Sequence, residues 1–337
     1  MIKTLIVDDS SLARDVIRDF LEKDGSFEII DEACDGEEAI DKILKLNPDL
    51  VTLDIEMPKK NGLQVIEAVT GKCNVPIVVI TSNDTAKMAY TATVLGALEF
   101  YSKSIFTSEL TKEKRTEIYD TLKRITSLKA GKNNQDKENV LNIEPKKREI
   151  KAVLIASSTG GPKALSSVFE KIPEDFPVPI IIVQHNTRGF DESFVEWLGT
   201  FTKLNVKIAR DKDELNKGCV YIAHTDIHLG VKREWEGFKF FTDDGEAENN
   251  QKPAADFLFR TASECLRDSV ISVVLTGMGS DGAIGTKFIK ERGGITLAQD
   301  EKSSLIYGMP KAAAETGCVD MVLDLEEIPQ ELIKLVS

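Results

Sequence analysis

One short turn of hydroxyl-bearing and glycine residues has the composition that covalent catalysis requires. Residues 157–161 read Ser-Ser-Thr-Gly-Gly, after an apolar stretch at 152–155 and before a helical pattern at 163–169. A strand end that leads into a helix exposes backbone N–H groups and can hold a nucleophile clear of its strand. Ser158 is therefore a candidate nucleophile.

A serine hydroxyl is a weak nucleophile at neutral pH, so it needs a base that is itself oriented by a carboxylate. His185 follows the apolar stretch 179–183, and Asp281 follows the apolar stretch 270–275. Because all three candidates lie at or just past a strand end, one crevice can hold Ser158, His185 and Asp281. The chain order and the lack of the first glycine of Gly-x-Ser-x-Gly differ from α/β-hydrolases. Geometry and not order defines a triad, so neither difference excludes one.

Several other interpretations of these residues stay open on sequence alone. Ser157 could be the reactive hydroxyl in place of Ser158. The turn 159–161 could bind a phosphate, although it lacks the lysine spacing of a P-loop and the glycine spacing of a dinucleotide motif. His185 could be a core histidine. A metal site at His224 and His228 is a weaker possibility.

A second group of reactive residues lies at strand ends in the first half of the chain, at Asp8, Asp9, Asp54, Thr81 and Lys103. Converging carboxylates raise one another's pKa unless a cation lies among them. Mg²⁺ prefers oxygen ligands of this kind. A carboxylate beside Mg²⁺, with a lysine and a threonine in reach, can accept a phosphoryl group. The sequence therefore predicts a phosphoacceptor site.

The elements that must position both groups alternate between strand and helix patterns. This alternation predicts an α/β protein with two doubly wound, mainly parallel sheets. A segment at 238–241 is expected to form an antiparallel excursion. The expected parallel strands are 4–7, 27–30, 50–53, 77–80 and 98–101 in the first half and 152–155, 179–183, 220–223, 270–275 and 295–298 in the second.

A polar segment divides the chain into two expected domains. A helical pattern at 109–128 closes the first domain, which we place at 1–128. Residues 129–147 have little apolar surface to bury and are expected to form a flexible linker. The second domain then covers 148–337.

Composition places the chain among ordinary globular proteins. The chain has 337 residues, 42% of them hydrophobic, and a formal net charge of −13, so non-specific nucleic-acid binding is not expected. The five scattered cysteines form no Cys-x-x-Cys pair and are expected to be reduced, mostly buried thiols. No apolar run suits a signal peptide or a membrane span. We expect a cytoplasmic monomer that is not inserted in a membrane.

The first domain resembles the flavodoxin-like receiver domain of bacterial response regulators, over residues 1 to about 125. The resemblance implies that Asp54 is the phosphoacceptor, that Lys103 pairs with the phosphoryl group and that Thr81 moves to hydrogen-bond it. It also implies that Phe100 is an aromatic residue that changes burial on switching. Ser104 stands where the family usually has proline, which leaves the cis peptide bond of the family in doubt here. The implied Mg²⁺ ligands are Asp8, Asp9, Asp54 and the backbone carbonyl of Glu56.

The second, Rossmann-like domain resembles the CheB chemotaxis methylesterases. The resemblance is carried by Ser-Thr-Gly-Gly-Pro at 158–162, Gln-His at 184–185, Leu-Thr-Gly-Met-Gly-Ser-Asp-Gly-Ala at 275–283, Ala-Gln-Asp at 298–300 and Tyr-Gly-Met-Pro-Lys-Ala-Ala at 307–313. It implies a protein-glutamate methylesterase, often also a glutamine deamidase, that acts on chemoreceptors. The phosphodonor would be a CheA-type histidine kinase, and the esterase reaction would need no cofactor.

The same resemblance assigns the roles in the second domain. Ser158 would be the nucleophile, His185 the base and Asp281 the orienting carboxylate. The backbone N–H of Met278 would bind the oxyanion, and Thr159 would hold the serine and histidine in place. The family usually has Gly-Ala before the nucleophile, where this chain has Ala156-Ser157, so an extra hydroxyl could compete for the base.

Three hypotheses about function follow from the sequence. The first is the methylesterase, in which the unphosphorylated receiver covers the crevice of Ser158 and phosphorylation of Asp54 loosens that cover. The second is a non-catalytic signalling module, in which a receiver is joined to a receptor-binding domain. The third is a hydrolase of a small ester or amide.

Overall fold

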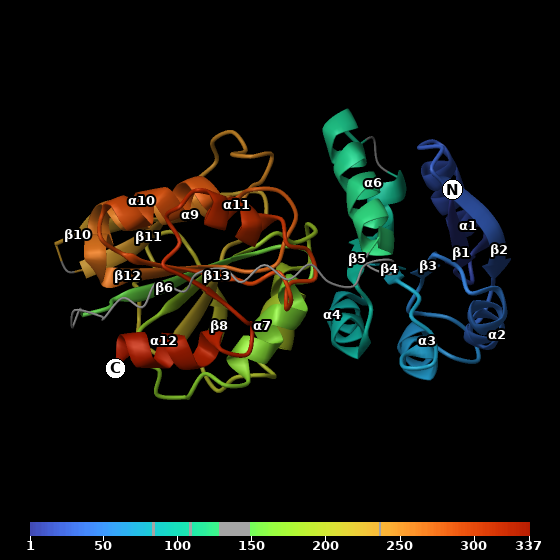
Figure 1. Cartoon of the computed structure of the whole chain (residues 1–337), viewed down its shortest axis with the longest axis horizontal. Helices are drawn as coiled ribbons and strands as arrows, with labels where there is room; N and C mark the ends of the chain where they lie inside the picture. The colour runs from blue at the N-terminus through green and yellow to red at the C-terminus, as the bar shows by residue number, and fades with distance from the viewer. Residues whose placement is uncertain (83–84, 108–109, 128–148, 236) are drawn as a thin grey trace. The chain divides into compact units, whose positions relative to one another are not determined.

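The computed structural model of the chain describes residues 1–82, 85–107, 110–127, 149–235 and 237–337. The described residues form two compact units, one before and one after residues 128–148 (Figure 1). Each unit is therefore treated by itself. The expected linker at 129–147 lies outside the described residues, so the boundaries of the two domains stay predictions.

The first unit contains a sheet of five parallel strands in the order β2-β1-β3-β4-β5. The predicted parallel sheet is confirmed. Because the strand order reverses between β1 and β3, ligands are expected at the carboxyl ends of these two strands. The strands are β1 (Ile2–Val7), β2 (Phe27–Ala33), β3 (Leu50–Leu53), β4 (Ile77–Thr81) and β5 (Glu99–Ser102).

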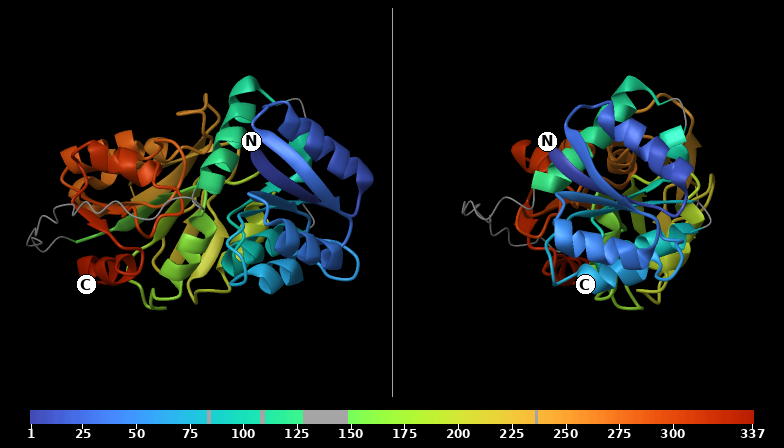
Figure 2. Two further views of the ribbon diagram at one scale, coloured as in Figure 1. Left: turned by 45° about the vertical axis from the view of Figure 1, so that its right-hand side comes forward. Right: turned by 90° about the vertical axis from the view of Figure 1, so that its right-hand side faces the viewer.

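Helices cover both faces of this sheet (Figures 1 and 2). The last helix begins at Lys112, three residues later than predicted. A short helix that directly follows β5 was not predicted. The helices are α1 (Ser11–Glu22), α2 (Gly36–Leu46), α3 (Gly62–Val69), α4 (Ala86–Leu95), α5 (Lys103–Thr107) and α6 (Lys112–Ser127). Helices α1 and α6 lie on one face, and α2, α3 and α4 lie on the other.

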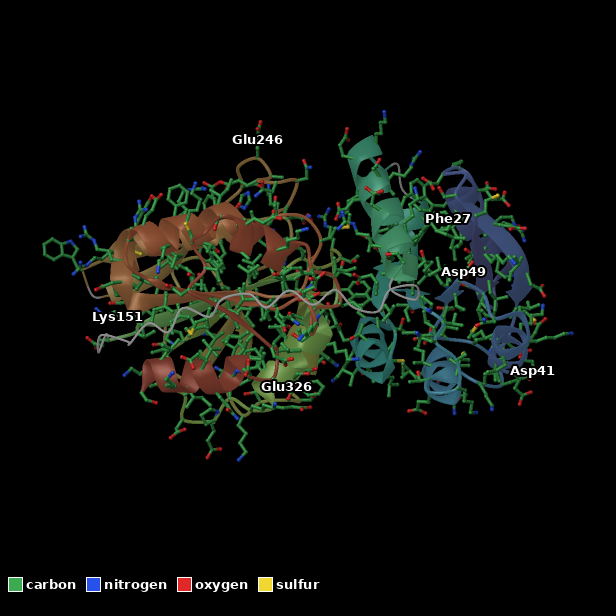
Figure 3. All side chains as sticks on the ribbon, viewed as in Figure 1. Phe27, Asp41, Asp49, Lys151, Glu246 and Glu326 are labelled. Atoms are coloured by element: carbon green, nitrogen blue, oxygen red, sulfur yellow. The ribbon has the colours of Figure 1, made fainter. Side chains whose placement is uncertain are left out.

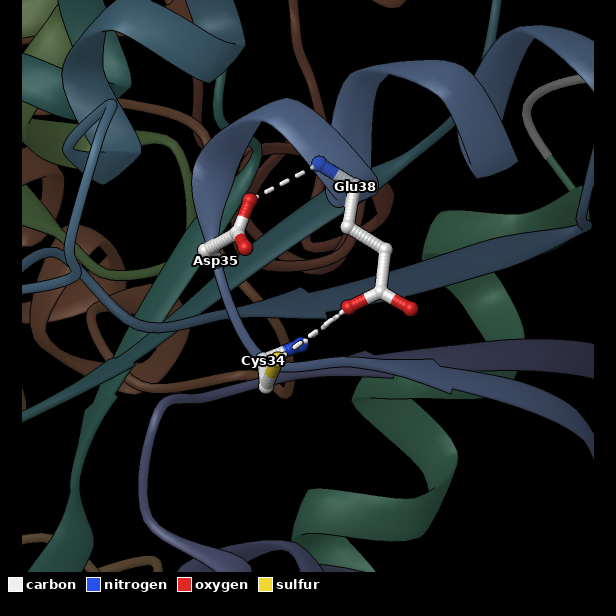
Figure 4. A group of neighbouring side chains, drawn as sticks. All are labelled: Cys34, Asp35 and Glu38. Atoms are coloured by element: carbon white, nitrogen blue, oxygen red, sulfur yellow. Dashed lines mark hydrogen bonds between the residues drawn. The ribbon is translucent and has the colours of Figure 1, made fainter.

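A cluster of Cys34, Asp35 and Glu38 forms the start of α2 (Figure 4). Asp35 Oδ1 accepts from the backbone N–H groups of Glu37 at 3.0 Å and Glu38 at 2.9 Å. Glu38 Oε2 in turn accepts from the backbone N–H of Cys34 at 2.9 Å. Asp35 Oδ2 lies 2.7 Å from Lys59 Nζ. These carboxylates satisfy the free N–H groups of a helix start, which explains why they gather here.

The second unit contains a sheet of seven parallel strands in the order β14-β13-β12-β6-β7-β9-β8. All five predicted strands are present. Two short edge strands, β8 and β14, were not predicted. The strand order reverses at β6, so a crevice is expected at the carboxyl ends of β6 and β12. The strands are β6 (Ala152–Ser157), β7 (Ile180–Gln184), β8 (Asn205–Ile208), β9 (Cys219–Ile222), β12 (Val270–Val274), β13 (Ile295–Gln299) and β14 (Met321–Leu323).

Helices again cover both faces of the sheet (Figure 1). The antiparallel excursion is confirmed as a hairpin of β10 (His228–Glu234) and β11 (Gly237–Asp243). The other elements are α7 (Gly161–Phe169), α8 (Asp191–Leu198), α9 (Ala255–Leu266), the 3-10 helix η3 (Arg267–Ser269), α10 (Ala283–Glu291), α11 (Met309–Glu315) and α12 (Ile328–Val336). Helices α9, α10 and α11 lie on one face, and α7 and α12 lie on the other.

The central strands β6, β7 and β12 are buried along their whole length, which explains their continuous apolar sequences. Their side chains on one face join a core that includes Leu154, Ile181, Phe259 and Ile289. The strands that lead to the candidate catalytic residues thus lie in the close-packed core of the unit.

Three minor expectations can now be compared with the structure. The cis peptide bond of the described residues is Lys252–Pro253, so the bond between Lys103 and Ser104 is trans. All five cysteines are free thiols, but Cys34 is exposed and the other four are only half-buried, so the prediction of mostly buried thiols was wrong. Within the described residues, no helix combines the length and the apolar character that crossing a membrane requires.

Candidate active site and phosphoacceptor site

Ser158 is the first residue past the end of β6, and it is partly exposed. Its backbone N–H donates to Thr276 O at 3.1 Å. Its carbonyl accepts from Gly161 N at 2.7 Å and from Gln184 Nε2 at 3.1 Å. Partners from the turn itself, from β7 and from the segment after β12 therefore fix the backbone of Ser158.

Ser157 is in a different environment from Ser158. Its side chain is fully buried, and its hydroxyl donates to Gln184 Oε1 at 2.7 Å. The extra hydroxyl is thus engaged inside the fold, and no hydrogen bond joins it to His185 in the described part of the chain. This geometry favours Ser158 over Ser157 as the accessible hydroxyl of the turn.

His185 and Asp281 form a buried pair. His185 Nε2 lies 2.8 Å from Asp281 Oδ2, and their side chains are 9% and 2% exposed. Burial acts to raise the pKa of Asp281, but hydrogen bonds from His185, Ala255 and Asp256 outweigh it and lower that pKa. Since Asp281 is therefore ionised near neutral pH, Nε2 carries the proton and Nδ1 has the free lone pair.

The register of β6 and β7 places Ser158 beside His185. Ser157 is paired with Gln184, and His185 N donates to Ser157 O at 3.0 Å. The next two residues along the strands are therefore Ser158 and His185. His185 Nδ1 is buried without a hydrogen-bond partner among the described residues. Nδ1 is thus the nitrogen left available to act as a base, since hydrogen bonds to a nucleophile often form only when substrate binds.

The loop after β12 packs against Ser158. A Cβ added to Gly277 would lie 2.8 Å from Ser158 Cβ, which is closer than real Cβ contacts. The same loop is held by Gly277 N, which donates to Ile306 O at 3.1 Å, and by Met309 N, which donates to Gly277 O at 2.8 Å. Met278, the predicted oxyanion donor, directly follows Gly277 and is half-buried. Glycine at 277 is therefore required for the close approach of this loop.

Thr159 is buried and contacts the same loop through its backbone. Thr276 Oγ1 donates to Thr159 O at 3.0 Å. Within the described residues, the hydroxyl of Thr159 makes no hydrogen bond with Ser158 or His185. Its role in holding these two residues stays a prediction.

The other two histidines are not brought together as metal ligands. Among the described residues, the groups of three or more potential metal ligands contain no histidine. The side chain of His228 is 1% exposed, and both of its ring nitrogens make hydrogen bonds with the backbone. His224 is half-exposed. The structure gives no support to the metal interpretation.

Asp256 is a neighbour of the active site that the sequence did not assign. Its Oδ1 accepts from Gly285 N at 2.6 Å, and its Oδ2 accepts from Asn249 Nδ2 at 2.7 Å. Burial, with a smaller contribution from the charge of Asp281, raises the pKa of Asp256 to about 6. An acidic residue in the first turn of a helix, here α9, is the available signal in the sequence, because such residues are often involved at helix N-termini.

The strand ends of the first unit form a carboxylate cluster. One oxygen from each of Asp8, Asp9 and Asp54 lies within 4.8 Å of the others. Lys103 Nζ lies 2.8 Å from Asp54 Oδ2 and 2.8 Å from Asp8 Oδ2. Burial and the charge of Asp8 raise the pKa of Asp54, although Lys103 opposes this effect. Four of the five residues predicted for the phosphoacceptor site thus converge.

The cluster fits a divalent cation. Asp8 Oδ2 is buried and forms no hydrogen bond of good geometry among the described residues, despite its ion pair with Lys103. Asp8 and Asp54 are buried and Asp9 is exposed, and oxygens from three carboxylates are the ligand set that suits Mg²⁺. Glu56, whose backbone carbonyl was predicted as a further ligand, is exposed just after β3. Its participation stays a prediction.

Thr81 ends β4 and is fully buried. Its Oγ1 lies 2.5 Å from Thr85 Oγ1, so in this structure its hydroxyl is bonded towards the start of α4. Phe100 is also buried, and its ring packs edge-on against Tyr90 with centroids 4.8 Å apart. Movement of Thr81 towards a phosphoryl group would break the contact with Thr85.

Comparison with known families matches both units. The family model described as CheB methylesterase matches residues 153–332, and the model described as response regulator receiver domain matches residues 4–115. The chain belongs to the CheB methylesterase family. The resemblance inferred from the two sets of motifs is thereby confirmed.

Two relatives of this CheB-family chain are similar to it over nearly the whole of its length. A Pyrococcus horikoshii relative, named protein-glutamate methylesterase/protein-glutamine glutaminase, is 38% identical over 100% of this chain and 94% of its own length. A Clostridium acetobutylicum relative of the same name is 39% identical over 99% and 98%. The crystal structure of the Thermotoga maritima CheB methylesterase catalytic domain is 42% identical, with a TM-score of 0.55, and covers 56% of this chain and 100% of its own.

Proposed function

We propose that this chain hydrolyses glutamate methyl esters, and deamidates glutamines, on the cytoplasmic domains of chemoreceptors. Two of its relatives carry the names of both activities. The observation that carries the proposal is the 2.8 Å hydrogen bond between His185 and Asp281, one strand away from the accessible Ser158. Together they supply the nucleophile, the base and the orienting carboxylate that acyl transfer to serine requires.

In the proposed mechanism, Ser158 Oγ attacks the ester carbonyl of a receptor glutamate. His185 Nδ1 takes the serine proton, while Asp281 stabilises the resulting imidazolium through Nε2. The same proton is then given to the leaving methoxide, which departs as methanol. Water, with His185 again as base, cleaves the acyl-enzyme and frees Ser158. For glutamine, the proton goes to the amide nitrogen of the intermediate, which then leaves as ammonia.

The oxyanion of the tetrahedral intermediate needs donors that are already in place. We assign one donor to the backbone N–H of Met278, because the adjoining Gly277 packs against Ser158. The loss of one such donor typically costs about 10²–10³ in rate. No cofactor is needed for this chemistry.

Control of the activity is assigned to the first unit, with Asp54 as phosphoacceptor and a CheA-type histidine kinase as phosphodonor. Asp8, Asp9 and Asp54 would hold Mg²⁺, whose positive charge offsets the repulsion between carboxylates and phosphate. Lys103 would pair with the phosphoryl group, and its contact with Asp54 supports this role. We further propose that the enzyme acts in the cytoplasm as a monomer.

Methanol release from methylated receptor membranes tests the proposal, with a small-molecule phosphodonor and Mg²⁺ present. Ser158→Ala should lower the rate by at least about 10³-fold, because removal of a serine nucleophile leaves only binding and oxyanion contacts. The matched control is Ser157→Ala, which removes a buried hydrogen bond and should cost about 1 kcal/mol in stability with little loss of rate.

The same assay distinguishes the two rival functions. Release that persists in Ser158→Ala contradicts the serine mechanism. An absence of release from the unmodified protein favours a non-catalytic receptor-binding module. Hydrolysis of small esters that receptor peptides do not inhibit favours a small-molecule hydrolase.

A further inference from the structure

Asp281 is held in place by the first turn of α9. Ala255 N donates to Asp281 Oδ2 at 2.7 Å, and Asp256 N donates to Asp281 Oδ1 at 2.9 Å. Helix starts have N–H groups without helical partners and a partial positive charge, so they suit a carboxylate. Since the same Oδ2 accepts from His185, the position of the α9 start determines the direction in which Asp281 meets His185.

The preceding N–H of the same helix start is bound by a histidine. Ala254 N donates to His228 Nδ1 at 3.2 Å. Ala254 is the N-cap residue of α9, and it makes no side-chain capping bond. Three consecutive N–H groups, those of Ala254, Ala255 and Asp256, are thus satisfied by two side chains from other elements. Asp281 takes the part of an N-cap side chain, and His228 takes the part of the N3 side chain, which accepts from the N-cap N–H in a capping box.

His228 is fixed in one tautomer and one orientation. Because Nδ1 accepts from Ala254, the ring proton is on Nε2, which donates to Glu246 O at 2.9 Å. The side chain of Glu246 points away from the body of the unit (Figure 3), and its backbone carbonyl receives this bond. The His228 ring also stacks on Phe257 of α9, with centroids 4.8 Å apart and an interplanar angle of 16°.

The starts of α9 and α10 are linked in both directions. Asp281 lies just before α10 and binds the first turn of α9. Asp256 lies in α9 and accepts from Gly285 N, in the first turn of α10, at 2.6 Å. A shift of the α9 start therefore acts on Asp281 through its own donors and through the start of α10.

We propose that His228 is a positioning residue for the hydrolytic reaction. It holds the start of α9, which holds Asp281, which orients His185. In the described part of the chain, His228 makes no hydrogen bond with His185 or Asp281, so its effect is indirect. The inference rests on the proposed function, because it requires Asp281 to act in catalysis.

Two substitutions distinguish the hydrogen bond made by Nδ1 of His228 from the one made by Nε2. In His228→Asn, the side-chain oxygen can take the place of Nδ1 and accept from Ala254 N. In His228→Gln, the side-chain nitrogen can take the place of Nε2, which leaves Ala254 N without an acceptor. We expect His228→Gln to lower kcat by roughly 10- to 100-fold with little change in KM, because small misplacements of catalytic groups have effects of this size. His228→Asn should stay within about threefold of the parent on the same grounds.

The test is a double-mutant cycle with Asp281→Asn in the full-length chain, assayed by methanol release with a phosphodonor. If His228 acts through Asp281, His228→Gln lowers kcat in the parent and has no further effect in Asp281→Asn. An equal loss in both backgrounds, or equal losses for the Asn and Gln variants, overturns the inference. If Asp281→Asn is as active as the parent, the proposed catalytic role of Asp281 is wrong. This result differs from one that contradicts only the role of His228.

Proton NMR of the hydrogen bond between His185 and Asp281 gives a second readout. Its low-field resonance should be retained in His228→Asn and should broaden or shift in His228→Gln. An unchanged resonance in a folded His228→Gln variant contradicts a positioning role. Should His228→Gln fail to fold, His228→Asn alone decides, since a loss of activity of more than about tenfold there overturns the inference.

Discussion

At the scale of single residues, the candidate site depends on which polar atoms are already bonded. Ser157 and Ser158 differ by one position, yet Ser157 is buried and bonded to Gln184, whereas Ser158 is accessible. Asp281 is bonded through both oxygens, so it can orient His185 but cannot turn away. The roles proposed for these residues therefore depend on the hydrogen bonds that each side chain already makes, and not on residue type alone.

The buried Asp256 predicts a specific dependence of stability on pH. Its pKa is raised from an ordinary 3.8 to about 6 in the fold, so the folded state binds this proton more tightly than the unfolded state does. The resulting stabilisation is complete below about pH 4 and is lost as the pH rises through 6. The loss amounts to about 3 kcal/mol.

Asp256→Asn should remove this loss, because the amide can accept from Gly285 and pair with a flipped Asn249. Urea unfolding at about pH 4.5 and pH 7.5 gives the free energy of unfolding of both proteins. The stability of the variant relative to the parent should increase with pH. Equal pH dependence in the two proteins would show that Asp256 is ionised as readily in the fold as outside it.

At the scale of elements, the two candidate sites lie where the strand order of each sheet reverses. Asp8 and Asp54 directly follow β1 and β3, and Ser158 and the loop of Gly277 follow β6 and β12. This placement requires close packing of backbone segments from different strands. The most demanding contact is the one between Gly277 and Ser158.

Gly277→Ala should therefore impair catalysis more than stability. The added Cβ would lie 2.3 Å from Met309 Sδ and 2.8 Å from Ser158 Cβ. Displacement of Ser158 should lower kcat by about 10² or more, with a stability loss of about 1–3 kcal/mol. Methanol release and thermal unfolding measure the two effects. An unchanged kcat would mean that the loop relaxes without moving the serine.

The long buried strands were predicted from the sequence, whereas the two short edge strands of the second sheet were not. The central strands are continuous apolar runs, so all ten predicted parallel strands are present. The edge strands β8 and β14 are short and partly exposed, which weakens their hydrophobic pattern. In β2, Asp31 and Glu32 continue the strand beyond its predicted end, because ion pairs with Lys42 and Arg14 accommodate their charge.

The site was predictable where strand ends carried reactive side chains, and not where function depends on contacts between distant segments. The convergence of Asp8, Asp54 and Lys103 follows from parallel strands alone. The bonds of His228 to the start of α9 join β10 to a helix 26 positions later in the chain, so no local pattern encodes them. The hydrogen-bond partners of His185 and His228 could not be predicted from the sequence for the same reason.

At the scale of the whole molecule, the proposed function requires that phosphorylation of one unit changes the activity of the other. A shift from a 1:99 to a 99:1 population of closed and open states needs about 5.5 kcal/mol of differential stability. The burial of Asp54 beside Lys103 makes it suited to such a change, since a phosphoryl group would replace an existing ion pair. Occlusion of Ser158 by the unphosphorylated receiver is our hypothesis for the closed state.

Removal of the receiver should therefore raise activity. A 145–337 fragment is expected to release methanol faster than the unphosphorylated full chain, and a phosphodonor should not affect it. Asp54→Asn in the full chain should keep the low basal rate and lose the response to the phosphodonor. If the fragment is no faster than the unphosphorylated chain, the receiver does not act by occlusion.

The central claim is that Ser158, served by His185 and Asp281, is the nucleophile. The most direct measurement is to label the phosphodonor-treated full chain with a fluorophosphonate and to identify the modified residue by peptide mass spectrometry. The account predicts modification of Ser158 alone, with loss of labelling in His185→Ala. Modification of Ser157, or labelling of Ser158 that does not depend on His185, would contradict it.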